Sequence, residues 1–244
     1  MIADAPDAWQ WEATATHRTL VERDASGARL LKESGPLARL RITVPVPWAV
    51  PGRLDAAAGI AYGRLDYDGR TQSGAPLATI THHTEGEAGL RWRPVGMQPW
   101  GEPSLSLDAL WFRRDIAQTA AAAGLRETST MWLAGFGWKG PRWQIARWPL
   151  ALHASWRTGV VHRLHIDYGG LFDDSSLRAG RRNEFSLGAT VSLAANWSAA
   201  LDWHRSRQAA SGVVNIHRGG VVAGTVFQPR ISIDDVALTL SKQF

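Results

Sequence analysis

Hydrophobic and polar residues alternate with a period of two along most of the chain. In the segment "WQWEATATHRTLVE", Trp9, Trp11 and Ala13 share one parity, and polar residues occupy the other. This alternation is typical of strands whose two faces meet different surroundings. The same pattern recurs in "ARLRITVPV", "RLDAAAGIAYG", "TEGEAGLRWR", "SLSLDALWF", "TSTMWLAGFGW", "LALHASWRTGVVHRLHI", "EFSLGATVSLA", "NWSAALDWHRS" and "VALTLSKQF". We therefore expect ten strands, with the short "TAAAAGL" segment at residues 119–125 forming a loop.

Ten antiparallel strands of this kind can form a soluble barrel or sandwich with its apolar face inward, or a membrane barrel with its apolar face outward. The polar parity distinguishes these architectures, because it carries arginine and carboxylate but almost no lysine. Arginine and carboxylate form the forked pairs suited to a closed lumen, whereas lysine is typical of a solvated surface. The predicted lumen network consists of Glu12, Arg39, Arg41, Glu85, Glu87, Arg91, Arg93, Asp108, Glu184, Asp202 and His204.

The connections between the expected strands alternate between long and short. The long ones are expected near residues 24–36, 66–78, 115–126, 167–182 and 209–226. The short ones are expected near residues 47–53, 94–103, 140–149 and 195–197. Bacterial barrels have long extracellular loops and short periplasmic turns, which places both termini in the periplasm. The last long connection contains "GVVNIHRGGVVAGTV", which also fits a hairpin and would give either twelve barrel strands or a hairpin above the membrane.

Tryptophan is unusually frequent, with 13 residues in the chain. Those at or beside the expected short connections are Trp48, Trp92, Trp100, Trp143, Trp148 and Trp197. An indole ring prefers the headgroup level of a membrane, where its apolar body is buried and its N–H stays hydrated. These residues predict an aromatic girdle at the periplasmic interface, and the alternative is that they are core aromatics of a soluble β protein.

The last nine residues, "VALTLSKQF", place Val236, Leu238, Leu240 and Phe244 on one parity. This segment resembles the closing strand of bacterial outer-membrane proteins, which ends in Phe after alternating apolar residues. The resemblance implies an all-β transmembrane antiparallel up-and-down barrel, with residues 1–244 as one domain in a Gram-negative outer membrane. It also implies that the barrel-assembly machinery recognises these four residues. The start, "MIADAPDAWQW", looks like a mature chain whose signal peptide has been removed.

Composition narrows the range of functions. A content of 45% hydrophobic and 20% charged residues excludes a disordered chain. The net charge of +5 comes from dispersed basic residues, so no nucleic-acid partner is expected. Cysteine is absent and the eight histidines lack metal-ligand spacing, so neither a metal nor another cofactor is expected.

The expected function is non-enzymatic. A ten-stranded barrel with charged inward residues has a plugged lumen or at most a thin water path, unlike a 16-stranded porin. Such a barrel acts through its loops as an envelope-structural or adhesion protein, or serves as the outer-membrane component of a transport or secretion assembly. Its expected surroundings are outer-membrane lipid and lipopolysaccharide, with a protein partner in an envelope complex.

One alternative is enzymatic. "LDYDG" contains Asp66 and Asp68, and "LHIDYGG" contains His165 and Asp167, at the extracellular ends of two expected strands. Two such pairs facing each other across the barrel mouth could activate a water molecule by general base catalysis. This arrangement resembles that of omptins, ten-stranded outer-membrane proteases with an Asp-x-Asp and an Asp-x-His pair, although the second pair here has the reverse order. The plainer interpretation is a turn at "YDG" and a solvated histidine.

Overall fold

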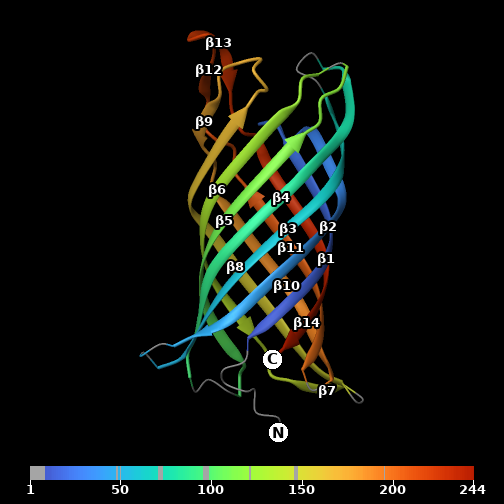
Figure 1. The fold of residues 1–244 in the computed structure, drawn as a ribbon, viewed down its shortest axis with the longest axis vertical. Helices are drawn as coiled ribbons and strands as arrows, with labels where there is room; N and C mark the ends of the chain where they lie inside the picture. Colours follow the sequence, from blue (N-terminus) through green and yellow to red (C-terminus); the bar gives the residue numbers. More distant parts are fainter. Residues whose placement is uncertain are drawn as a thin grey trace.

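The structure is a computed structural model that describes residues 9–47, 49, 51–70, 74–95, 99–120, 122–145, 148–194 and 196–244. Ten long strands form a closed antiparallel barrel (Figure 1). They are β1 (Gln10–Arg23), β2 (Arg29–Val46), β3 (Arg53–Arg70), β4 (Pro76–Arg93), β5 (Glu102–Ile116), β6 (Leu125–Lys139), β8 (Trp148–Asp167), β10 (Arg182–Ala194), β11 (Trp197–Gln208) and β14 (Arg230–Gln243). The prediction of a ten-stranded all-β barrel is confirmed. Within the described ranges, no helix is long and apolar enough to cross a membrane.

The barrel closes where its first and last strands meet. β14 pairs with β1 from Gln10 opposite Gln243 to Arg23 opposite Arg230, and on its other edge it pairs with β11. The closure continues to the end of the chain, because the Phe244 N–H donates to the Trp9 carbonyl over 3.0 Å. Their rings are stacked with centroids 4.2 Å apart. The chain therefore ends as a paired strand.

Four short strands lie outside this set of ten. β7 (Trp143–Ile145) and β9 (Ser175–Arg178) each extend along β8, while β12 (Val214–Arg218) and β13 (Val221–Val226) pair only with each other. The hairpin turns through Gly219 and Gly220, whose φ angles of 58° and 81° favour glycine. The twelve-stranded alternative is therefore wrong, and the segment forms a hairpin above the barrel rim (Figure 1).

Trp9, the first described residue, and Phe244 lie at one end of the barrel, here called the terminal end, and the hairpin lies at the other, the loop end (Figure 1). Two expected long loops were too wide. β2 already begins at Arg29 and β3 continues to Arg70, so residues 29–36 and 66–70 are strand. Most outward positions in these segments are charged or polar, as at Lys32 and Asp68, because they extend beyond the apolar part of the wall.

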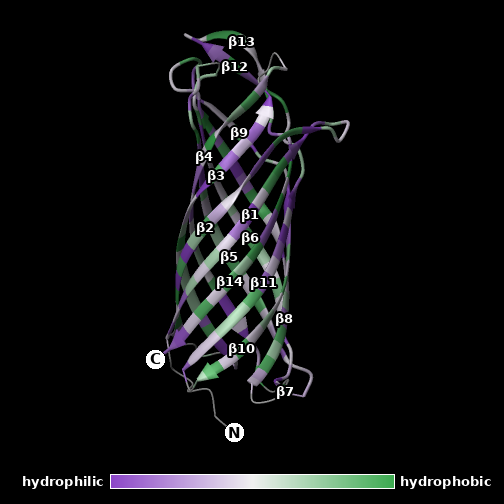
Figure 2. Cartoon of the chain, turned by 90° about the vertical axis from the view of Figure 1, so that its right-hand side faces the viewer, coloured by the Kyte–Doolittle hydropathy of each residue, from purple (hydrophilic) through white to green (hydrophobic). Residues whose placement is uncertain are grey.

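The outer face of the wall is apolar over the terminal part of the barrel. Its exposed residues include Leu40, Ile42, Ile60, Leu90, Leu105, Leu107, Phe136, Leu187, Leu201, Val236, Leu238 and Leu240. Figure 2 shows hydrophobic and hydrophilic residues alternating along the strands. A continuous outward apolar band is the defining feature of barrels that stand in lipid. The outward direction of the apolar parity is therefore confirmed.

Aromatic residues border this band on both sides. At the terminal end, Trp100 and Trp143 are exposed, while Trp92, Trp148 and Trp197 are half-buried; Trp48 lies outside the described residues. A second, unpredicted set faces outward toward the loop end: Tyr62, Trp111, Trp132, Trp156, Phe185 and Trp203. Two positions further toward the loop end, each of the six is followed by a charged or polar outward residue. The sharp change is typical of a membrane interface.

Candidate functional site in the barrel lumen

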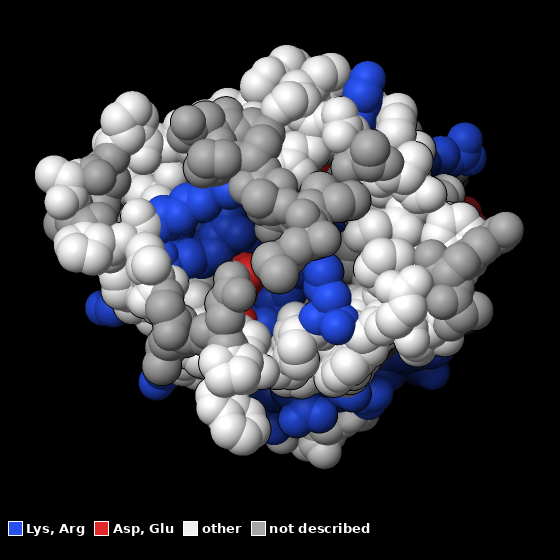
Figure 3. All heavy atoms as spheres, turned by 90° about the horizontal axis from the view of Figure 1, so that it is seen from below, with Lys and Arg blue, Asp and Glu red and all other residues white. Residues whose placement is uncertain are grey.

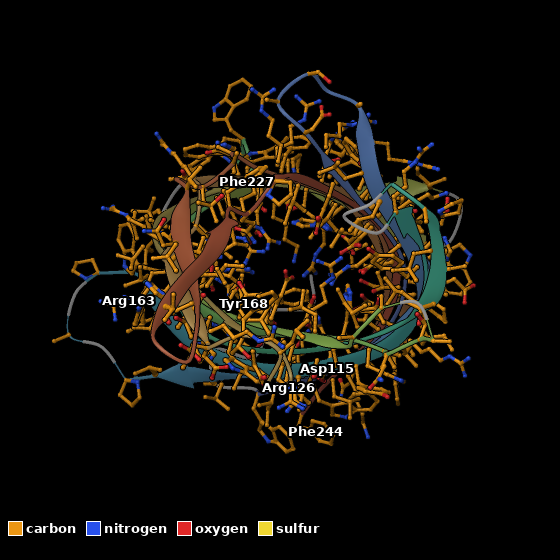
Figure 4. All side chains as sticks on the ribbon, turned by 90° about the horizontal axis from the view of Figure 1, so that it is seen from above. Asp115, Arg126, Arg163, Tyr168, Phe227 and Phe244 are labelled. Atoms are coloured by element: carbon orange, nitrogen blue, oxygen red, sulfur yellow. The ribbon has the colours of Figure 1, made fainter. Side chains whose placement is uncertain are left out.

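The lumen contains a cavity of about 660 Å³ that is lined by residues from all ten barrel strands. All eleven residues of the predicted lumen network line it. Figure 4 shows nitrogen- and oxygen-tipped side chains pointing from the wall into the interior. Glycines make room for these groups: a Cβ on Gly188 would lie 2.2 Å from Asp202 Oδ1, and one on Gly89 would lie 2.1 Å from Asp108 Oδ1. The side chains that sequence parity assigned to the lumen therefore line this cavity.

Eight charged or titratable side chains form a continuous series of contacts around the lumen, here called the ion-pair belt. In contact order its members are Arg39, Glu85, Arg18, Asp235, His204, Glu184, Arg157 and Asp108. They come from β2, β4, β1, β14, β11, β10, β8 and β5, respectively. The belt therefore links eight of the ten strands through the barrel interior.

Arg18 is the most buried cation of the belt, with 4% of its side chain exposed. Its Nη2 lies 2.8 Å from Asp235 Oδ2, and its Nη1 contacts Glu85. The same Glu85 accepts a hydrogen bond of 2.7 Å from Arg39. Burying a charge is tolerated only when it is paired, so these contacts compensate one another and fix the relative positions of β1, β2, β4 and β14.

The other half of the belt is centred on Glu184, which is 2% exposed. Its Oε2 lies 2.6 Å from Arg157 Nη2, and Arg157 Nη1 lies 3.4 Å from Asp108. His204 joins the two halves, with its ring nitrogens 3.6 Å from Glu184 and 3.7 Å from Asp235. The belt therefore lines the cavity at this level with paired charges.

A second group of charges, here called the lumen plug, lies nearer the loop end. Its members are Arg114, Glu22, Glu33, Glu127 and His83. Arg114 is 2.6 Å from Glu22, 2.7 Å from Glu33 and 2.8 Å from Glu127. Glu33 also lies 2.7 Å from His83 Nε2, and neither side chain is exposed. The plug is thus a largely buried cluster of paired charges, in which His83 Nδ1 has no hydrogen-bond partner among the described residues.

Two hydrophobic clusters lie at the same end of the barrel. One consists of Leu20, Leu31, Tyr67 and Ile233, and the other of Leu164, Ile166, Leu177 and Ala179. All of these side chains are less than 9% exposed. Apolar side chains exclude water from the space they fill, and the clusters and the plug together occupy the loop-end part of the lumen.

Sequence reasoning missed the lumen plug and Asp235. Glu33 and Glu127 fell in or at the edge of expected loops, and the fifth expected strand ended two residues before Arg114. Continuing the parity of Asp108 and Phe112 by one step would have placed Arg114 inside. Asp235 follows from the same step along β14, because it alternates with the outward Val236.

The structure does not bring the residues of the enzymatic alternative together. Asp66 and Asp68 alternate with the buried Leu65 and Tyr67 of β3 and face outward, and Asp68 is 2.9 Å from Arg29. Similarly, His165 and Asp167 alternate with the buried Leu164 and Ile166 of β8. His165 Nδ1 lies 3.1 Å from Ser176 Oγ.

The outward position of Asp167 can be followed through its neighbours. Asp167 Oδ2 lies 3.5 Å from Arg126, whose Nε donates to Asp115 over 2.7 Å. Figure 4 shows Asp115 and Arg126 together on the outside of the wall. The Asp66/Asp68 pair and the His165/Asp167 pair therefore lie on the outer surface of the barrel. Their strands, β3 and β8, are four positions apart around the wall. The two pairs share no site for an activated water molecule.

Asp173 anchors the β12–β13 hairpin to the connection after β8. Its carboxylate accepts hydrogen bonds from the Gly220 N–H over 2.9 Å and the Gly219 N–H over 3.1 Å. These two N–H groups lower the pKa of Asp173 below its ordinary value. A lowered pKa in the folded state contributes stability at neutral pH, and this contribution is lost as the pH falls through that pKa.

Asp173→Asn is therefore expected to loosen the hairpin without unfolding the barrel. Limited proteolysis at neutral pH should cleave the hairpin several-fold faster in this variant, while the urea midpoint of the barrel stays the same. Acidification should accelerate hairpin opening in the unmodified protein and have less effect on the variant. Equal cleavage rates at neutral pH would show that Asp173 does not hold the hairpin. Asp174→Asn provides the matched control in the same connection.

Comparison with known proteins places the fold. The sequence matches no protein-family model and no curated protein. Among solved structures, the outer membrane protease OmpT from Escherichia coli is similar over 98% of this chain and 98% of that chain, with TM-score 0.54 and 9% identity. The translocator domain of the autotransporter NalP from Neisseria meningitidis is similar over 100% of this chain and 91% of that chain, with TM-score 0.49 and 11% identity. At such low sequence identities, structural similarity shows a shared fold and nothing about function. The chain has the fold of the bacterial outer-membrane β-barrels.

Proposed function

We propose that this protein is a non-enzymatic barrel of the bacterial outer membrane, with a sealed lumen and a rigid loop end that serves an envelope-structural or adhesion role. The observation that carries the proposal is the combination of ion-pair belt, lumen plug and hydrophobic clusters across the interior. A lumen filled in this way does not support free diffusion of nutrients, which separates the protein from the wide porins.

The loop end supports the adhesion role. The strands continue beyond the apolar band, and their inner face there is packed with the lumen plug and the two hydrophobic clusters. Such packing holds the connections and the β12–β13 hairpin on a stiff base, and rigidly held loops are where recognition usually occurs. In this proposal the loop end faces the cell exterior and contacts a protein partner or lipopolysaccharide, while both termini face the periplasm.

The terminal strand supports the expected route of assembly. Val236, Leu238 and Leu240 face outward on β14, and Phe244 is paired with Trp9 at the barrel closure. All four residues are exposed and remain available on one face of the strand until it inserts. We therefore retain the barrel-assembly machinery as a proposed partner during biogenesis.

Planar bilayer recording tests the sealed lumen. The purified full-length chain is expected to require detergent, to migrate faster on a gel before boiling than after, and to produce no steady conductance steps after insertion. A heat-denatured aliquot controls for detergent artefacts. Steady open steps in the protein that shows the heat-dependent migration would contradict a sealed lumen. Solubility as a single species without detergent would contradict the membrane location.

A further inference from the structure

The lumen near the terminal end has a wall of arginines. Arg41 of β2, Arg53 of β3, and Arg91 and Arg93 of β4 all line the cavity within about five residues of the terminal ends of their strands. These three strands are neighbours in the barrel. Figure 3, viewed from the terminal end, shows Lys and Arg side chains gathered inside the hollow at this end. The arrangement presents several guanidinium groups to one space.

These arginines are incompletely neutralised. Asp55 is 2% exposed and is shared by Arg53 at 2.8 Å and by Arg93. Arg41 lies 3.5 Å from Glu87, and its Nε has no hydrogen-bond partner among the described residues. Arg91 stands opposite Asp55 in the β3–β4 register, yet its side chain makes no ion pair or hydrogen bond with the described part of the chain.

The charge balance of this part of the lumen is positive. Its cavity-lining cations are Arg41, Arg53, Arg91, Arg93, Lys139 and Arg142, and its acids are Glu12, Asp55, Glu87, Glu102 and Asp202, so six cations face five acids. Asp202 is already engaged, 2.6 Å from His153 Nε2. In the ion-pair belt every guanidinium contacts a carboxylate, whereas Arg91 contacts none among the described residues and Arg53 and Arg93 share one. Like charges in a confined space repel one another unless a counterion binds between them.

The opposite wall offers hydroxyl groups. β3 and β10 are five strands apart in either direction around the barrel, so the arginine wall faces β10 and its neighbours. The hydroxyl residues that line the cavity there are Ser155, Ser186, Thr190, Ser192 and Ser198. Hydroxyl donors opposite guanidinium forks suit a hydrophilic anion with several oxygen acceptors.

We propose that the arginine wall and the facing hydroxyl groups form a binding site for a multivalent oxyanion of the phosphate class, entered from the terminal end. Guanidinium forks match the oxygen spacing of phosphate, and the negative charge of the anion offsets the surplus on Arg91 and its neighbours. The site lies on the terminal side of the ion-pair belt. It can therefore hold a ligand whether or not the lumen conducts.

Inorganic phosphate is the probe for this site. Bound phosphate stabilises the folded barrel by mass action, so the unfolding midpoint of the full-length chain in detergent should rise with phosphate at constant ionic strength. Calorimetric titration should give the corresponding affinity. Arg91→Gln is expected to weaken that affinity at least about tenfold, the effect of losing one charge-assisted contact to the anion. The matched control, Arg64→Gln on the outer face of β3, should bind phosphate like the unmodified protein.

Several results would overturn the proposal. The first is an absence of phosphate binding by protein that is shown to be folded by its heat-dependent migration. The second is equal affinity in the Arg91→Gln and unmodified proteins. The third is equal stabilisation by chloride at the same ionic strength, which would indicate simple screening. If Arg91→Gln fails to fold, Arg91→Lys keeps the charge but loses the fork and should bind more weakly; undiminished affinity would count against the site. Bilayer conductance tests whether the lumen is sealed, and its result neither supports nor contradicts the phosphate site.

Discussion

Arg114→Leu is expected to lower the free energy of unfolding of the barrel by about 3–5 kcal/mol, the usual cost of removing one partner from a buried ionic group. Arg114 is the only cation in contact with Glu22 and Glu33 among the described residues, apart from His83 beside Glu33. Its removal leaves buried carboxylates with only His83, beside Glu33, to offset their charge. Leucine fills much of the space but supplies no donor.

Urea unfolding in lipid vesicles, followed by tryptophan fluorescence, measures this effect. Arg113→Leu is the matched control, because the neighbouring arginine faces outward and its ion pair with Asp115, at 2.7 Å, is 37% exposed on the arginine side. An exposed pair is worth about 0–1 kcal/mol. Adding Glu33→Gln to Arg114→Leu should recover part of the loss. Equal costs at positions 113 and 114 would show that the lumen plug does not stabilise the barrel.

The strand pattern predicted much of the lumen because side-chain direction in a strand depends on parity alone. Once "TEGEAGLRWR" is a strand with Leu90 outward, Glu85, Glu87 and Arg91 must point inward. Which of them touch is a different matter, since contacts across the lumen depend on the register of every strand between them. Arg18 and Asp235 are 217 positions apart and meet only because the barrel closes. Parity therefore identified the lining but not the belt.

The loop end was misjudged because the pattern inverts there within single strands. In β3, Ile60 and Tyr62 face outward in the apolar band, but Leu65 and Tyr67 are buried inside while Asp66 faces outward. The period of two persists, yet the apolar residues change faces, as they must where lipid gives way to water. If one constant apolar face is required of a strand, the predicted strand ends at this point. At the loop end, the barrel has its apolar residues inside and its polar residues outside, as a soluble barrel does.

This inversion also explains why Asp66 and Asp68 face outward. Asp66 and Asp68 share a parity with the lipid-facing residues of β3, so extension of the strand carries them to the outer surface. The spacing of two correctly places both carboxylates on one face of the strand. It does not determine which face, and the enzymatic alternative needed the inner one. Local spacing predicts a shared face, and only the surroundings of that face decide its chemistry.

Leu238→Arg is expected to destabilise the barrel by about 2–4 kcal/mol in lipid, the cost of placing an arginine at the middle of the apolar band. Leu238 is 59% exposed and lies between Ala15 of β1 and Leu201 of β11 in the register of the outer wall. Lipid is the expected neighbour of this side chain, and hydrocarbon cannot solvate a guanidinium group. The measurement is urea unfolding of the vesicle-inserted barrel.

Leu171→Arg is the control for Leu238→Arg, because Leu171 is also an exposed leucine, at 42%, but lies in the connection after β8 at the loop end. Water solvates an arginine there, so the expected change is within about 0.5 kcal/mol. The difference between the two variants isolates the surroundings from the substitution. If both variants unfold like the unmodified protein, water rather than lipid must contact Leu238, and the outer face would not stand in a membrane. A large cost at position 238 alone would place the hydrocarbon layer directly on β14.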